Sequence, residues 1–209
     1  MTKDSVLHSC LASDLPDCQQ CQRLAGFLQS VRTQYPDYHA RPVSAFGDRC
    51  AQLLIVGLAP GMHGANRTGR PFTGDHAGIL LYQTLHKFGF STQPESIAAD
   101  DDLQLIGCRI TNSVKCLPPE NKPTPQEIKQ CNHYLAAELQ LFAHQAVLMG
   151  LQLKMKDFPF AHGAVHHLPA GAGLRLYDSY HCSRYNTQTK RLTTAMFEQI
   201  FARIIADLK

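Results

Sequence analysis

The stretch from Leu53 to Leu81 constrains the fold of this chain more than any other. It opens with an apolar run at residues 53–56, which has the length and β-branched content of a buried strand. A sharp turn at residues 57–61 and a long glycine-rich loop follow, and a helical pattern starts at Gly78. A strand, a loop of small residues and a helix together form a ligand site at the carboxyl end of an open α/β sheet. Small residues let a ligand approach the main chain, whose free N–H groups hold an anion or a carbonyl oxygen.

The loop matches neither the P-loop nor the dinucleotide-binding fingerprint. It carries polar side chains that a plain turn does not need: His63, Asn66, Arg67, Arg70, Thr73 and Asp75. The loop alone leaves a purely structural connection open as the alternative.

Strand and helix patterns alternate along the rest of the chain, which predicts an α/β fold with a parallel sheet covered on both faces. We expect an open three-layer α/β/α sandwich with a central, mainly parallel four-stranded sheet, and residues 1–209 as a single domain with an N-terminal arm. Thr124 and Glu127 predict a capped helix start. The expected strands are residues 53–56, 109–112, 146–150 and 174–180, the expected helices are 22–35, 78–88, 124–142 and 192–208, and 38–48 is expected to be irregular.

Composition excludes little. The net charge of +3 permits nucleic-acid binding without arguing for it. No apolar run approaches a membrane span and no signal peptide opens the sequence, so a cytoplasmic protein is expected.

The cysteines are the second informative feature. The chain has eight, and disulfides are not expected in a reducing compartment. Cys18 and Cys21 form a C-x2-C pair, whereas Cys116 and Cys131 lie far along the chain. Their spacing leaves a zinc site and an iron–sulfur cluster equally open. Cys10, Cys50 and Cys108 are expected to be small buried apolar residues.

Four stretches in order carry a resemblance to a known family. The loop sequence GLAPGMHGANRTGRPFTGD resembles the first motif of the uracil-DNA glycosylase superfamily, in the variant of family 5, the type B enzymes. Leu58 stands where family 4 enzymes have Glu. The other stretches are residues 110–116, 160–164 and 179–186. The resemblance implies the superfamily's α/β fold and a DNA repair glycosylase that hydrolyses the N-glycosidic bond of uracil, and of other deaminated bases such as hypoxanthine.

The resemblance also implies a 4Fe-4S cluster with Cys18, Cys21, Cys116 and Cys131 as ligands. Its role would be structural, tying the N-terminal arm to the loop after Asn112.

The same resemblance assigns the pocket. Phe72 is expected to stack on the extruded base, and the Asn112 amide to read its edge. His181 and the turn formed by Gly57, Leu58, Ala59 and Gly61 are expected to hold the base O2. Asp75 replaces the missing carboxylate of the turn as a catalytic residue that positions water or balances the cation on the sugar, with helix N-cap as its alternative role.

DNA containing uracil or other damaged bases is the expected partner of a monomeric protein. Arg67, Arg70 and Arg184 are expected to contact its phosphates. A family 4-like uracil-specific enzyme, a non-catalytic DNA-binding protein of the same fold and an electron-transfer protein are the alternatives. Cys182 departs from the family pattern, which has Pro there, and puts the substrate range in question.

Overall fold

A three-stranded mixed sheet forms the centre of the molecule. The computed structural model describes residues 15–142, 157–168 and 174–208. Within them, β2 (Leu53–Gly57) and β3 (Cys108–Asn112) pair in parallel, and β1 (Phe46–Gly47) pairs antiparallel with β3 on its other side. The register places Gly57 opposite Asn112, so both strands end at the same edge.

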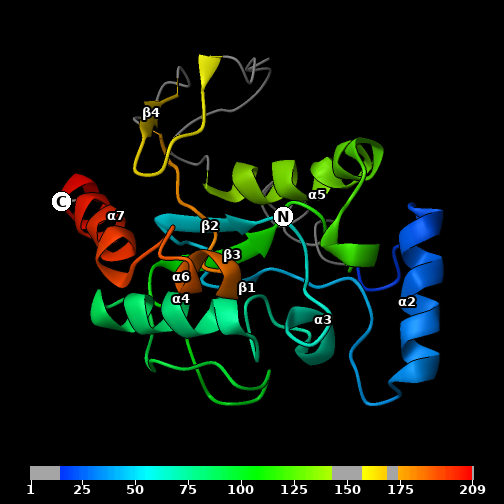
Figure 1. Cartoon of the computed structure of the whole chain (residues 1–209). Coiled ribbons are helices and arrows are strands. Elements are labelled where there is room, and N and C mark those ends of the chain that lie inside the picture. Colours follow the sequence, from blue (N-terminus) through cyan, green and yellow to red (C-terminus); the bar gives the residue numbers. More distant parts are fainter. Residues whose placement is uncertain (1–14, 143–156, 169–173, 209) are drawn as a thin grey trace, which may run out of the picture.

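Helices cover both faces of this sheet (Figure 1). On one face, α4 (His76–Lys87) and α7 (Thr194–Leu208) pack with Cys108 and Ile110 of β3 into the main core. On the other, Thr111 of β3 donates a 2.8 Å hydrogen bond to Glu138 of α5 (Pro125–Phe142). Alternate residues of β3 thus face opposite helical layers, as a strand requires. The expected α/β class with helices on both faces is confirmed.

The expected four-stranded, mainly parallel sheet is not confirmed. Residues 146–150 lie outside the described residues. The segment 174–180 does contain β5 (Arg175–Tyr177), but β5 pairs antiparallel with β4 (Val165–His167) in a separate two-stranded sheet. Pairing with a near neighbour in sequence closes a shorter loop than joining β2 or β3 would.

The expectation of irregular chain at residues 38–48 is also wrong in part, because β1 lies there. Gly47 has a φ of +112°, and a Cβ there would meet the Cys108 carbonyl oxygen at 2.5 Å. A two-residue strand that includes glycine carries no periodic signal in sequence.

A second core joins the N-terminal helix to the start of α5. Leu24, Leu28 and Val31 of α2 (Gln22–Gln34) pack with Val114 and Leu117 from the loop after β3. The predicted capping box at the start of α5 is confirmed, since Thr124 and Glu127 exchange hydrogen bonds of 2.8 and 3.2 Å. Arg23 of α2 also pairs with Glu127 at 2.7 Å.

The remaining short helices are α3 (Ala65–Thr68), η1 (Pro119–Asn121) and α6 (Arg184–Gln188). The helices described here include none with the length and apolar character needed to cross a membrane.

Candidate active site and cysteine pocket

The turn after β2 is tied to the end of β3. The carbonyl oxygens of Gly57 and Leu58 accept the N–H groups of Ser113 and Val114, each at 2.9 Å. These bonds extend the parallel pairing past the sheet edge and hold Asn112 beside the turn. Within the described residues, the main-chain N–H groups of Ala59 and Gly61 have no hydrogen-bond acceptor. The turn therefore presents donors at the sheet edge.

Gly57, Phe72 and Asn112 converge at this edge. A Cβ built on Gly57 would clash with Asn112 Oδ1 and lie 2.9 Å from two carbon atoms of the Phe72 ring. Because glycine has no side chain, the Asn112 amide and the edge of the Phe72 ring can lie directly against the main chain here. Phe72 is half-buried and Asn112 is only 3% exposed. The sequence prediction that these residues share a site agrees with their position.

Phe72 occupies an unusual main-chain conformation that its surroundings hold in place. Its φ is +54°, in the left-handed region that non-glycine residues rarely adopt. Tyr82 donates its hydroxyl to the Pro71 carbonyl at 3.0 Å. The absence of a side chain at Gly78 leaves room for the Phe72 carbonyl, which a Cβ there would strike. The main chain of Pro71 and Phe72 is thus packed directly against α4.

His181 lies next to Phe72, with 5.8 Å between the ring centroids and 33° between the ring planes. Although His181 as a whole residue reaches the surface, the protein packed around its ring desolvates it and lowers its pKa. The negative charge of Asp75 acts in the opposite sense and raises that pKa. The ring is therefore neutral at neutral pH.

Asp75 has its two carboxylate oxygens in different surroundings. Oδ1 accepts the Gly78 N–H at 3.0 Å and caps α4, so the N-cap role is confirmed. Oδ2 faces the turn: a Cβ at Gly61 would lie 3.6 Å from it, and a Cβ at Gly64 would clash with it. One oxygen is used by the helix, and the other lies against the loop.

Cys182 follows His181 and is packed in the main core, 4% exposed. Burial, with a smaller contribution from the charge of Asp75, raises the pKa of its thiol to about 12. It is a neutral apolar residue at neutral pH, and its small side chain fills the core behind the loop.

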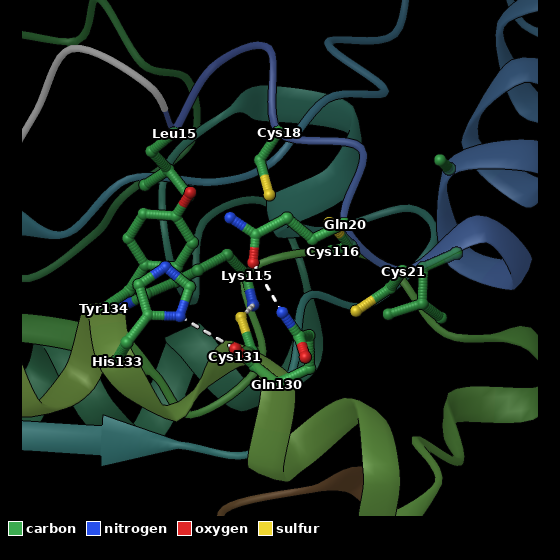
Figure 2. A pocket seen from close by; sticks show the side chains of 12 residues that line it. Leu15, Cys18, Gln20, Cys21, Lys115, Cys116, Gln130, Cys131, His133 and Tyr134 are labelled. Carbon is green, nitrogen blue, oxygen red and sulfur yellow. Dashed lines mark hydrogen bonds between the residues drawn. The ribbon is translucent and has the colours of Figure 1, made fainter.

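The four predicted cluster cysteines line a single pocket. Figure 2 shows the sulfur atoms of Cys18, Cys21 and Cys131 turned toward its interior, with Cys116 behind Gln20. Leu15, Leu24 and Ala25 add apolar walls, and Gln130 donates a 2.8 Å hydrogen bond to Gln20 across the space. The pocket draws its cysteines from the segment before α2, the loop after β3 and the second turn of α5.

The thiols influence one another electrostatically. Burial, together with the charges of Cys131, Cys18 and Cys21, raises the pKa of Cys116 to about 12. Burial likewise raises the pKa of Cys131, although the Lys115 N–H, 3.3 Å from its sulfur, opposes that rise. Across residues 15–142, 157–168 and 174–208, no three His, Cys, Asp or Glu side chains are close enough together to hold one metal ion.

The expected DNA-contacting arginines separate into two kinds. Arg67 and Arg184 are exposed, and Arg67 also donates to the His63 carbonyl at 2.8 Å. Arg70 is only 5% exposed and pairs with Asp101 at 2.5 Å. The expectation that Arg70 contacts phosphates is therefore wrong, because its guanidinium is buried and already paired.

The expectation for the other three cysteines had mixed outcomes, and one further cation is buried. Cys108 is buried as expected, whereas Cys50 is exposed, and Cys10 lies outside the described residues. Lys115, one of the cations beside the motifs, is fully buried and pairs with Glu138 at 2.8 Å. Neither Asp101 nor Glu138 was anticipated as a partner, since each lies more than twenty residues from the cation that it binds.

Comparisons with known proteins show what the chain is similar to. The model of the uracil DNA glycosylase superfamily matches residues 44–209. A Type-5 uracil-DNA glycosylase of Thermus thermophilus is 44% identical over 203 residues, covering 89% of this chain and 91% of the relative. Another, of Pyrobaculum aerophilum, is 37% identical over 206 residues, covering 92% of this chain and 90% of the relative. A Type-4 uracil-DNA glycosylase of Archaeoglobus fulgidus is 30% identical over 131 residues, covering 62% and 52%.

Proposed function

Because the chain belongs to the uracil DNA glycosylase superfamily, we propose that it is a repair glycosylase of the family 5 type. In this proposal it hydrolyses the N-glycosidic bond of uracil in DNA and leaves an abasic site. The greater coverage and identity of the Type-5 relatives support family 5 over a family 4-like enzyme.

The convergence of Gly57, Phe72 and Asn112 carries the proposal. A glycosylase must take its base out of the stack, place it against an aromatic face and read its Watson–Crick edge. Phe72 supplies the face, and the Asn112 amide supplies both a donor and an acceptor for N3–H and O4 of uracil. Because Gly57 has no side chain, the Asn112 amide and the Phe72 ring can lie together against the strand end, where the base is proposed to bind.

Departure of the base leaves negative charge on its O2 and positive charge on the sugar. His181 stands beside the stacking ring and donates to O2, together with the N–H groups of Ala59 and Gly61. In this proposal the sugar lies beside the turn formed by Leu58, Ala59 and Gly61, where the Leu58 side chain is half exposed at 50%.

Asp75 balances the positive charge that develops on the sugar and orients the attacking water. Its Oδ2 lies against the turn while Oδ1 caps α4, so both roles fit one side chain. The cap fixes the carboxylate, and a fixed charge needs no reorganisation during the reaction.

Cys18, Cys21, Cys116 and Cys131 hold a 4Fe-4S cluster in this proposal. A buried set of thiolates that repel one another needs a cation, which the cluster iron supplies. Four cysteine thiolates are the usual ligand set of such a cluster, and these four side chains line one pocket. The role is structural: the cluster joins three segments, one of which continues directly from Asn112.

The substrate range extends to other deaminated bases such as hypoxanthine, since the turn offers main-chain groups and no acidic side chain to select uracil. Arg67 and Arg184, both exposed beside the site, contact phosphates of the damaged strand. A monomer suffices, because all the proposed groups come from one chain.

The test is formation of abasic sites in oligonucleotides that contain one uracil or one hypoxanthine, single-stranded and paired. After alkali treatment, we expect more strand cleavage at the uracil position than in an undamaged control oligonucleotide. Binding to uracil DNA without any abasic product would contradict the proposal and indicate a non-catalytic DNA-binding protein. Excision of uracil without excision of hypoxanthine would contradict only the proposed wider substrate range.

A further inference from the structure

The motif at residues 160–164 has no role in the proposed chemistry, yet it holds the segment that leads to His181. Gly163 donates its N–H to the Asp178 carbonyl at 2.8 Å, and Asp178 donates its own N–H to the Ala164 carbonyl at 3.0 Å. Ala161 donates to Asp178 Oδ2 at 3.2 Å. The two segments are thus joined on both sides of Asp178.

His162 adds a contact closer to the site. The Tyr180 N–H donates to His162 Nδ1 at 3.1 Å, and the two rings stack with 5.0 Å between centroids and 12° between planes. The guanidinium carbon of Arg191 lies 4.6 Å from the Tyr180 centroid. Because Nδ1 accepts this bond, the neutral ring carries its proton on Nε2.

This contact matters because, among the residues that the structure describes, no strand of the central sheet leads into His181. β5 ends at Tyr177 and belongs to the separate two-stranded sheet, so residues 178–181 reach the site as irregular chain. The Tyr180 N–H belongs to the peptide immediately before Tyr180, one residue from His181. The hydrogen bond to this N–H fixes the orientation of the main chain, and that orientation determines where the His181 ring lies relative to Phe72.

We propose that His162 is a positioning residue, whose Nδ1 holds the segment that places His181 beside Phe72 and Asp75. The inference rests on the proposed role of His181 in uracil excision. His162 acts through the main chain of Tyr180 and does not itself touch the base.

Two variants separate the hydrogen bond from mere packing. His162→Ala removes the acceptor and the ring, whereas His162→Asn keeps an acceptor at the δ position while removing the ring. His86→Ala, at an exposed position in the last turn of α4, is the matched control. Each variant is compared with the wild-type chain for single-turnover excision at saturating enzyme, affinity for uracil DNA and thermal unfolding.

We expect His162→Ala to lower the single-turnover rate about ten- to a hundredfold, since a displacement of about 1 Å has an effect of that size. Affinity for DNA should stay within about twofold, and His162→Asn should recover most of the rate. A wild-type rate in His162→Ala, or equal losses in both variants, would overturn the proposal.

A readout without catalysis separates this inference from the proposed function. The imidazole ¹⁵N signals of His181 should shift in His162→Ala and return toward wild-type positions in His162→Asn. Unchanged signals in His162→Ala would overturn the positioning role. If the wild-type chain leaves uracil DNA intact, the proposed function fails, and the NMR comparison still decides how His181 is held.

Discussion

At the scale of residues, the site depends on glycines that leave room for polar side chains. Gly57 lies against Asn112 and Phe72, and Gly64 lies against Asp75. In both places a single added carbon would displace a group that the proposed reaction uses. The glycines are therefore required for space beside functional groups, and neither of them has a positive φ.

Gly64→Ala should displace Asp75. A Cβ at Gly64 would lie 2.7 Å from Asp75 Cγ and 2.8 Å from its Cβ, so the side chain has to leave its cap position. We expect a loss of about 0.5–2 kcal/mol in the free energy of unfolding, the usual cost of a lost N-cap, together with slower excision. Denaturant unfolding and single-turnover kinetics measure the two effects.

Gly26→Ala is the matched control for that change. Gly26 lies in the middle of α2, where an added Cβ would have nothing within 4 Å, and α2 is remote from Asp75. Alanine there should stabilise the protein by about 0.5–1 kcal/mol and leave excision unchanged. A stable and fully active Gly64→Ala protein would show that Asp75 tolerates displacement.

Asp75→Asn should lower the pKa of His181 further. Burial already lowers that pKa below its ordinary value, and the Asp75 charge raises it in part. Removing the charge leaves burial unopposed, so His181 takes up its proton at a more acidic pH than in the wild-type protein. An NMR titration of the His181 ring measures the midpoint in both proteins. An upward shift, or none, would mean that the two groups do not interact.

The same substitution separates the two roles of Asp75. Asn caps a helix nearly as well as Asp, so stability should change little. A normal excision rate in Asp75→Asn would leave Asp75 as a cap alone.

The sequence predicted side chains well where a motif or a local pattern specified them. Asp75 at a helix start and the exchange between Thr124 and Glu127 are local, and both caps were anticipated. Arg70 was not placed correctly and the burial of Lys115 was not predicted, because burial of a charge depends on a partner distant in sequence. A single sequence contains no pairing signal for Asp101 or Glu138.

At the scale of elements, the N-terminal helix depends on contacts with the start of α5 and the loop after β3. Its second core is small, and Arg23 with Glu127 is its ion pair to α5. The cysteine pocket lies at the same junction. A cluster there would hold α2, the loop after Asn112 and α5 together.

Iron and sulfide should therefore be present in protein prepared without oxygen, and their removal should loosen this junction. Metal binding that joins separate segments contributes directly to folding free energy. Hydrogen exchange should become faster in residues 15–34 and 113–118 of the cluster-free protein, while the main core around α4 and α7 changes less. Stoichiometric zinc without iron would contradict the cluster, and unchanged exchange would contradict its structural role.

Helices and strands were predicted reliably where their apolar residues recur with a clear helical or strand spacing. The helices α2, α4, α5 and α7 and the strands β2 and β3 were all expected near their observed bounds. The strand with which β5 pairs was not predicted. Alternating apolar residues identify a strand, but they do not identify its pairing partner. β1 has only two residues and was missed altogether.

At the scale of the whole molecule, the chain brings four distant stretches to one edge of the sheet. Gly57 and Asn112 come from paired strands, Phe72 from the loop that packs on α4, and His181 from the segment held by residues 160–164. The motifs alone proposed these residues as members of one site. Their arrangement required the fold, since each contact among them joins residues far apart in sequence.

The central claim is that uracil is bound and released where Gly57, Phe72 and Asn112 meet, and Gly57→Ala tests it most directly. The main chain at Gly57 accepts alanine without strain, because its φ is not positive. The added carbon, however, forces the Asn112 amide or the Phe72 ring to move. The measurement is single-turnover excision of uracil at saturating enzyme, with Gly26→Ala as control and thermal unfolding as a check on the fold. We expect folded Gly57→Ala protein to excise uracil about a hundredfold more slowly or worse, and excision at the wild-type rate would contradict the account.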